Sequence, residues 1–271
     1  MTLGHGEVMT RREARAAQTS GAPTGDSTPP RSPRERPRVS PIGVLGELFI
    51  TAGVVVLLFI GWQQWFNDLV VGQQLHQEGI AQSQQWSAGT PDVAPAVEPS
   101  PDPPPVAARA GLTERFAWLI VPRFGDDYFR PIAEGTSTTT VLNRNNLGHY
   151  PDTTMPGEEG NFAIAAHRKA YGGNLEHIGE LRAGDHIYVE TPAGWYRYSF
   201  RNLEYVQPSG VGVLNAVPQT QLAADAQYIT LTSCNPFFST AERIIAYGVF
   251  DGWFPREGGA PDEIADTVRV G

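Results

Sequence analysis

The chain of 271 residues contains one cysteine, Cys234, at a position where a nucleophile could act. It ends the apolar segment QYITLTSC (227–234), whose β-branched residues are typical of a strand. Side chains alternate between the two faces of a strand, so we assign Ile229 and Leu231 to the core. Cys234 and Thr232 then share the other, polar face. A lone cysteine is often a small buried hydrophobic residue, but this placement favours a reactive thiol.

A cysteine nucleophile needs one partner that accepts and returns a proton and another that stabilises an oxyanion. His167 ends the segment NFAIAAHR (161–168), where small side chains on its strand face leave space around the imidazole. Arg243 opens the next strand-like segment after Cys234, and its permanent charge and several donors suit an oxyanion. Taken singly, His167 could be a structural histidine and Arg243 a surface cation. Together with Cys234, they predict nucleophilic catalysis.

Charge and cysteine count exclude several classes of protein. Lys and Arg total 20 against 29 Asp and Glu, so the net charge of −9 argues against general nucleic-acid binding. One cysteine excludes a disulfide framework, a Cys-rich zinc site and a Cys₄ iron–sulfur centre. The acid pairs Asp126/Asp127 and Glu158/Glu159 fit no EF-hand spacing and are typical of solvated loops. We therefore expect no metal and no cofactor.

A folded domain at 111–256 must position these residues. Its strand-like segments are short, β-branched or aromatic, and bounded by Gly, Pro or Asn. They are 116–122, 161–168, 185–191, 195–206, 227–234 and 243–250. ETPAGWY predicts a hairpin that turns near 192–194, and short helices are expected at 174–181 and after Pro208. The pattern predicts an all-β domain, and closure into a barrel would remove its exposed edges.

Residues 42–62 (IGVLGELFITAGVVVLLFIGW) carry a single charge, Glu47. At about 1.5 Å per residue, this segment matches a bilayer core of roughly 30 Å. A buried core helix and a cleaved signal peptide are the alternatives. The bulky side chains of Gln63, Gln64 and Trp65 follow where a signal peptidase needs small ones, which argues against cleavage. We expect a transmembrane signal anchor at 41–66.

The segments that flank this anchor and the domain differ in composition. Residues 1–40 hold seven Arg against four acids, which predicts a disordered basic tail. Such a tail favours a cytoplasmic N-terminus and a domain outside the cell. Residues 67–110 are rich in Gln, Ala and Pro and are expected to be an extracytoplasmic linker, with a helical stalk as an alternative at 70–88. A flexible tail is expected at 257–271.

The candidate residues and their order resemble a known family. TLTSC (230–234), with His167 in AAHR upstream and Arg243 downstream, resembles the sortase pattern of a TLxTC strand, an upstream His and a downstream Arg. The resemblance covers roughly residues 114–254. The stretches GHYPDTTMPGEEGNFAIAAHR, YGGNLEHIGELRAGDHI and TLTSCNP are most similar to class E, the housekeeping-type sortases of high-GC actinobacteria. Ser233 departs from the motif, which usually has Thr, but retains a hydroxyl.

The resemblance implies a fold and a reaction. The fold would be all-β, a closed eight-stranded β-barrel with short helices, preceded by one transmembrane helix. Cys234 would attack the Thr–Gly carbonyl of a LAxTG- or LPxTG-type C-terminal sorting signal and form a thioester. His167 would protonate the leaving amine and later deprotonate the incoming one. Arg243 would stabilise the oxyanion and help hold the signal peptide.

The resemblance also implies partners and a location. The partners would be surface proteins bearing a sorting signal and a lipid-linked peptidoglycan precursor whose amine accepts the acyl group. The protein would cross the plasma membrane once through 42–62, with a cytoplasmic N-terminus and an extracytoplasmic catalytic domain, and would bind no nucleic acid. Three further residues are expected at the substrate groove: Tyr150, Thr232 and Ser233. For Tyr150, ordinary loop packing is the alternative.

Other functions remain open on the sequence. An extracellular cysteine hydrolase would use the same cysteine and histidine and differ in transferring the acyl group to water. An L,D-transpeptidase also carries both residues, but its HxxxSHGC-like signature is absent. A pilin-polymerising sortase is a further alternative, although no obvious lid segment precedes Leu112. An inactive membrane-anchored binding module would leave the presence of all three candidate residues unexplained.

Overall fold

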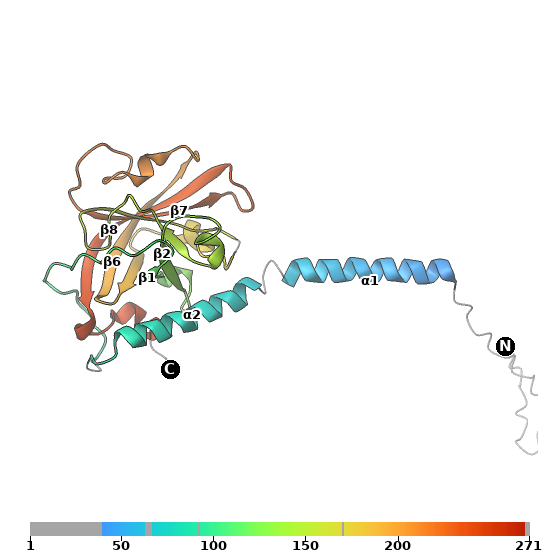
Figure 1. Cartoon of the computed structure of the whole chain (residues 1–271), viewed down its shortest axis with the longest axis horizontal. Coiled ribbons are helices and arrows are strands. Elements are labelled where there is room, and N and C mark those ends of the chain that lie inside the picture. The colour runs from blue at the N-terminus through green and yellow to red at the C-terminus, as the bar shows by residue number, and fades with distance from the viewer. Residues whose placement is uncertain (1–39, 63–66, 91–92, 170, 269–271) are drawn as a thin grey trace, which may run out of the picture. The chain divides into compact units, whose positions relative to one another are not determined.

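The computed structural model (Figure 1) describes four stretches of the chain: 40–62, 67–90, 93–169 and 171–268. The predicted basic tail at 1–40 therefore lies outside the described residues, except for its last residue. The chain divides into two compact units, Met1–Ala52 and Gly53–Gly271.

Helix α1 (Pro41–Gly61) coincides with the predicted anchor. Proline suits the first helical position, because its fixed φ matches the helix and no N–H is needed there. None of the 21 residues of α1 is buried. Within the described stretches, α1 is the one helix long and apolar enough to cross a membrane. A core helix of a soluble domain would be buried, so the exposed apolar side chains favour a membrane span.

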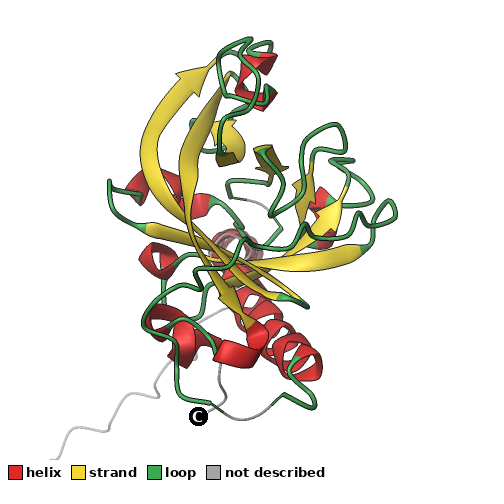
Figure 2. Ribbon diagram, turned by 90° about the vertical axis from the view of Figure 1, so that its left-hand side faces the viewer, coloured by secondary structure: helices red, strands yellow, loops and turns green. Residues whose placement is uncertain are grey.

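Eight strands close into a barrel, drawn in yellow in Figure 2. Neighbouring strands follow the order β1-β2-β3-β4-β7-β8-β6-β5, and β5 pairs with β1 to complete the ring. The pairs β2–β3 and β4–β7 are parallel and the others antiparallel. The predicted all-β barrel is thus confirmed. The strands are Arg115–Ile120 (β1), Phe129–Glu134 (β2), Leu147–His149 (β3), Gly160–Ala165 (β4), His186–Thr191 (β5), Gly194–Val206 (β6), Gln227–Asn235 (β7) and Glu242–Pro255 (β8).

Alternation along the strands fills the barrel with apolar side chains. Phe162 and Ile164 of β4 and Ile229 and Leu231 of β7 are at most 1% exposed and share one core cluster. Fully burying such a side chain contributes about 1.5–3 kcal/mol. The core therefore holds β4 and β7 firmly together and leaves their other faces to carry polar residues.

Two strands, β2 and β3, are not predicted from the sequence, for reasons of composition in β2 and of length in β3. All six residues of β2 are buried, and one of them is Pro131, so the strand shows neither polar alternation nor a typical β composition. Strand β3 has only three residues. The predicted hairpin is confirmed, since Thr191 of β5 pairs with Gly194 of β6. The expected short helices appear as 3₁₀ turns at Glu176–Glu180 and Val211–Leu214.

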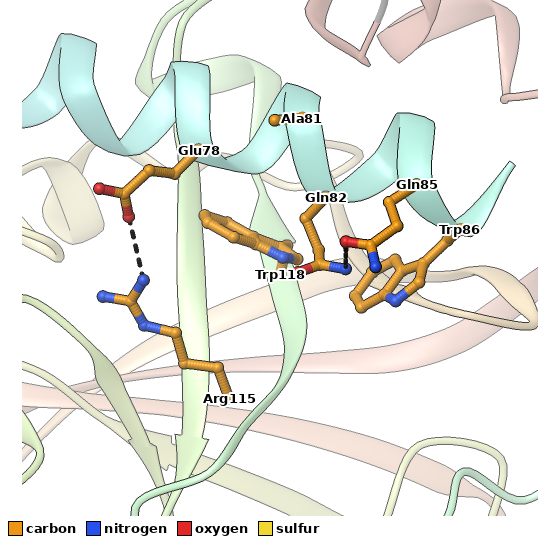
Figure 3. A pocket seen from close by; sticks show the side chains of 7 residues that line it. All are labelled: Glu78, Ala81, Gln82, Gln85, Trp86, Arg115 and Trp118. Atoms are coloured by element: carbon orange, nitrogen blue, oxygen red, sulfur yellow. Dashed lines mark hydrogen bonds and ion pairs between the residues drawn. The ribbon is translucent and has the colours of Figure 1, made fainter. Parts of the chain in front are cut away.

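Helix α2 (Asn67–Trp86) packs on the barrel instead of forming a free spacer. Leu75 and Ile80 are buried, and Gly79 lies so close to Phe129 that a Cβ there would come within 2.6 Å of its ring. Figure 3 shows the ion pair between Glu78 and Arg115 of β1, at 3.0 Å. The segment at 67–110 therefore begins with a helix of the folded unit. A pocket of about 330 Å³ lies along this contact, lined by Glu78, Ala81, Gln82, Gln85, Trp86, Arg115 and Trp118.

A buried ion pair fastens the C-terminal end of α2. Nη2 of Arg256 donates to Glu190 Oε1 at 2.8 Å, and the two side chains are 2% and 0% exposed. Ser83 of α2 donates its hydroxyl to the same carboxylate oxygen at 2.5 Å, and Arg256 Nη1 donates to Ser87 Oγ at 2.9 Å. Burial raises the pKa of Glu190, and Arg256 opposes that shift. Helix α2 thus completes the environment of a buried charge.

The proline-rich segment and the C-terminus also contact the barrel. Ser100 donates its N–H to Trp253 O at 2.7 Å, and Tyr196 donates its hydroxyl to Pro105 O at 2.7 Å. Ile264 is fully buried and Val268, in helix α3 (Ala265–Val268), is 6% exposed. They join a second core cluster with Ile80. The structure therefore differs from the expected flexible tail, because apolar side chains up to residue 268 pack against this cluster.

Candidate active site

Strand register brings the three sequence candidates into one row. Every Cα pair of β4 and β7 joins residues 67 apart, from Gly160–Gln227 to Ala165–Thr232. If this spacing is continued past the last pair, His167, two residues beyond β4, falls opposite Cys234, and the N–H of Ala166 still bonds the carbonyl of Thr232 at 3.1 Å. On the other side, Cys234 is the direct antiparallel partner of Arg243 in β8. Neighbouring strands lie about 4.8 Å apart, so imidazole, thiol and guanidinium come from three successive strand ends.

The faces of β7 agree with the predicted alternation. Ile229 and Leu231 are fully buried in the barrel core. Cys234 is half-buried and unpaired, and its thiol has no hydrogen-bond partner in the described part of the chain. It therefore lies at a strand end that loops can approach, as a reacting group requires.

The imidazole of His167 is held by one residue that the sequence did not single out. Nε2 lies 2.8 Å from Oδ1 of Asn143, in the 3₁₀ turn Leu142–Arg144. Since an amide oxygen only accepts, Nε2 carries the proton and Nδ1 is left as the basic nitrogen. The ring of Tyr171 lies 5.2 Å away, centre to centre. Burial lowers the pKa of His167 below its ordinary 6.5, so the imidazole is neutral at neutral pH.

The guanidinium of Arg243 is oriented through a single nitrogen. Nη1 donates to the carbonyl oxygens of Thr240 at 3.0 Å and Glu242 at 2.9 Å. Neither Nε nor Nη2 has a hydrogen-bond partner among the described residues. The side chain is therefore aligned by the backbone while it keeps N–H donors for a developing negative charge.

The other predicted contact residues divide into two groups. The hydroxyl of Tyr150 lies 3.1 Å from Oγ1 of Thr232, on the same face of β7 as Cys234. Ser233 differs from the expected groove contact, because alternation turns it to the opposite face. It is 3% exposed and donates its hydroxyl to the carbonyl of Ala166 at 2.9 Å. Ser233 thus supports the strand that leads to His167.

Sequence reasoning missed four polar residues at this site. Three of them, Arg168, Asn235 and Glu242, directly adjoin the three candidates in sequence, and that adjacency was the available signal. The fourth, Asn143, lies in an irregular loop without periodicity, so nothing in the sequence pointed to it. Among the described residues, no group of three His, Cys, Asp or Glu side chains could hold a metal ion.

A closed barrel that pairs a cysteine with an arginine on neighbouring strands, with a histidine just beyond the end of the next strand, defines a class of β-barrel cysteine enzymes. The sortase-domain family model matches residues 119–251. Sortase SrtE1 of Streptomyces coelicolor is 35% identical over 227 residues, which cover 81% of this chain and 60% of the relative. The chain belongs to the sortase family, and sortases are cysteine transpeptidases.

Solved structures agree with this assignment. The SrtA sortase from Actinomyces oris is 35% identical, with a TM-score of 0.60 over 64% of this chain and 99% of that one. Sortase E1 from Streptomyces coelicolor, solved with a tripeptide in its active site, is 37% identical, with a TM-score of 0.53 over 56% of this chain and 97% of that one. The resemblance to class E sortases is confirmed.

Proposed function

We propose that this chain is a membrane-anchored transpeptidase. It cleaves a LAxTG- or LPxTG-type C-terminal sorting signal between Thr and Gly and transfers the new carboxyl end to an amine of a peptidoglycan precursor. The observation that carries this proposal is the row formed by Cys234 and Arg243, paired across β7 and β8 of a sortase barrel, and His167, two residues beyond the end of the neighbouring strand β4.

The first half of the reaction uses all three members of the row. The neutral imidazole of His167 accepts the thiol proton at Nδ1, and the sulfur of Cys234 attacks the Thr carbonyl carbon. The free N–H donors of Arg243 stabilise the oxyanion. When the tetrahedral intermediate collapses, the C–N bond breaks and His167 returns its proton to the departing amine. The product is a thioester between Cys234 and the substrate.

The second half reverses these roles. The acceptor amine attacks the thioester carbonyl, His167 takes its proton, and the sulfur of Cys234 leaves. Water in place of the amine gives hydrolysis, so the two outcomes differ only in which nucleophile reaches the thioester. The tripeptide in the active site of the related Sortase E1 supports a peptide as the occupant of this site.

Helix α1 supports a membrane location. We infer that Pro41–Gly61 crosses the plasma membrane once, because its 21 unburied residues are predominantly apolar and match a bilayer core in length. The arginines at 1–40 favour a cytoplasmic N-terminus, with the barrel outside. Sorting-signal proteins and a lipid-linked acceptor would both reach an enzyme anchored in this way. A bilayer partition assay tests the membrane span. Protease added to intact cells should digest the barrel, and a protected barrel would contradict this orientation.

The reaction is tested with the full chain in detergent, a fluorescent LAxTG peptide and triglycine as the acceptor amine. The proposal expects a transfer product, a thioester adduct on Cys234 detectable by mass spectrometry, and no product from Cys234→Ala. Free acid as the sole product in excess triglycine would instead identify a cysteine hydrolase. Full transfer by Cys234→Ala would contradict the nucleophile assignment.

A further inference from the structure

A second row of polar side chains lies directly beside the candidate catalytic row. Arg168 follows His167, Asn235 follows Cys234, and Glu242 precedes Arg243. Asn235 and Glu242 are Cα partners in the β7–β8 ladder, and Arg168 and Asn235 keep the 67-residue spacing of the β4–β7 pairs. Each member of the catalytic row thus has one neighbour in this second row.

The three side chains form a continuous hydrogen-bonded chain. Arg168 Nη1 donates to Asn235 Oδ1, and Asn235 Nδ2 donates to Glu242 Oε2 at 3.1 Å. The charged groups fix the orientation of the amide, because its oxygen must face the guanidinium and its nitrogen the carboxylate. The guanidinium carbon of Arg168 also lies 4.3 Å from the ring centre of Phe237, which covers it.

These three hydrogen-bonded side chains lie where backbone pairing between the strands ends. The last β4–β7 pair is Ala165–Thr232, and beyond it the N–H of Ala166 still bonds the carbonyl of Thr232 at 3.1 Å. The β7–β8 ladder ends at the pair formed by Asn235 and Glu242. The ladder pairs Cys234 with Arg243 directly, whereas His167 lies beyond the paired part of β4. Side-chain bonds therefore add to the connection between the end of β7 and the segment that carries the imidazole.

We propose that Asn235 is a positioning residue for transpeptidation: bridged between Arg168 and Glu242, it holds His167, Cys234 and Arg243 in register. This inference rests on the proposed function for its reaction, although the geometry exists independently. Displacing reacting groups by about 1 Å can cost a hundredfold in rate. A residue that acts in this way affects kcat far more than KM, because it sets the alignment of the reacting groups and not the binding of the peptide.

A charge-matched pair of substitutions tests the bridge in the full chain. In Asn235→Asp, one oxygen still accepts from Arg168, but the other faces the carboxylate of Glu242 and repels it. We expect kcat for the LAxTG peptide and triglycine to fall at least about tenfold, with KM within threefold. Adding Glu242→Gln supplies an amide donor to the new carboxylate, so the double variant is expected to recover to within threefold of the wild type.

Three further variants serve as references. Asn235→Ala removes both bonds and should also lose at least about tenfold in kcat. Glu242→Gln alone retains an acceptor for Asn235 and gives the baseline against which the double variant is compared. Asn202→Ala removes an exposed asparagine of β6 and should change nothing. Thermal unfolding of each variant shows whether any loss reflects the fold.

The outcomes separate this inference from the proposed function. Asn235→Ala and Asn235→Asp within twofold of wild-type kcat overturn it, as does a loss confined to KM. A loss that follows the unfolding temperature and is not rescued in the double variant shows a structural role only and also overturns it. If the wild type transfers no peptide, the proposed function fails. The bridge is then tested by the rate at which iodoacetamide alkylates Cys234. A rate that Asn235→Asp alters at least threefold and that the double variant restores supports the bridge. Any other result overturns it.

Discussion

Oδ1 of Asn143 lies 2.8 Å from Nε2 of His167, and this contact joins a 3₁₀ turn to the residue that follows β4. It fixes which nitrogen of the imidazole bears the proton, because the amide oxygen can only accept. Burial of the ring at the same time disfavours the imidazolium. Burial thus favours a neutral imidazole, and the contact with Asn143 leaves Nδ1 as its available base.

The first prediction concerns the protonation of His167. Burial lowers its pKa, so we expect an NMR titration of the imidazole in Cys234→Ala to give a midpoint below 6.5. Cys234→Ala is used because it removes coupling to the thiol. A folded-state pKa below the unfolded value means that the unfolded chain binds more protons, so this residue destabilises the fold as pH falls through that range. A midpoint at or above 6.5 would contradict the role assigned to burial.

The second prediction concerns Asn143. Asn143→Ala removes the acceptor for Nε2 and frees the imidazole to rotate. One hydrogen bond contributes about 0.5–1.5 kcal/mol, so kcat should fall about two- to tenfold. The matched variant Asn143→Asp keeps an acceptor and adds a negative charge. That charge should raise the pKa of His167 and shift the pH–kcat profile toward higher pH. Profiles that coincide for both variants and the wild type would show that Asn143 does not orient the ring.

The third prediction concerns Arg243. Its unpartnered N–H groups are proposed to stabilise the oxyanion, and removing such a donor typically costs 10²–10³-fold in kcat. Arg243→Ala should lose that factor in the transfer assay. Arg243→Lys keeps the charge but not the planar fork of donors, so it should recover only part of the loss. Equal activity of the lysine variant and the wild type would show that charge alone suffices.

The fourth prediction concerns the buried pair that holds α2. Arg256→Met leaves Glu190 buried without its cation, which costs about 3–5 kcal/mol of unfolding free energy. Because burial raises the pKa of Glu190, protonation relieves that cost, so the variant should be less destabilised at pH 5 than at pH 8 in urea unfolding. Arg256→Met combined with Glu190→Gln should be more stable than Arg256→Met alone. A deficit independent of pH would show that lost packing, and not charge, explains the effect.

The fifth prediction concerns the close contact between α2 and the barrel. A Cβ at Gly79 would come within 2.6 Å of Phe129, whose side chain is fully buried and cannot yield. Gly79→Val should therefore destabilise the protein by about 1–3 kcal/mol through overpacking. Valine forms helix better than glycine, so helix propensity cannot explain such a loss. Ala81→Val, at an exposed position of the same helix, serves as a control without the close contact to Phe129. Similar unfolding curves for both variants would show that α2 does not press on β2.

The sequence predicts most of the barrel because its long strands alternate or are strongly β-branched. It does not predict β2, which is buried throughout, or the docking of α2. Only a few apolar side chains, such as Leu75 and Ile80, anchor that helix. The ion pair that contacts its C-terminal end, Glu190 with Arg256, comes from residues more than 100 positions later in the sequence. Such contacts depend on tertiary structure and have no local pattern.

The candidate site shows the same division. Residue type and order suffice to select His167, Cys234 and Arg243, and the strand register brings them level, while their catalytic roles stay predictions. Adjacency to the candidates marks Asn235, but the contacts of Asn143 and of the bridge have no signal in the sequence, because they join side chains across 24 and 67 residues. Ser233 illustrates the reverse case: strict alternation already places it on the core face.

The 67-residue spacing between paired positions of β4 and β7 has a consequence for how the protein folds. Such distant partners must close a large loop before any contact rewards them, so sheets of this kind form slowly, over milliseconds to seconds. The row also needs β8, the last strand of the chain. A partly folded copy thus carries a thiol without its base or its oxyanion donor. Reactivity therefore requires the β4–β7 and β7–β8 pairings together, and no strand carries it alone.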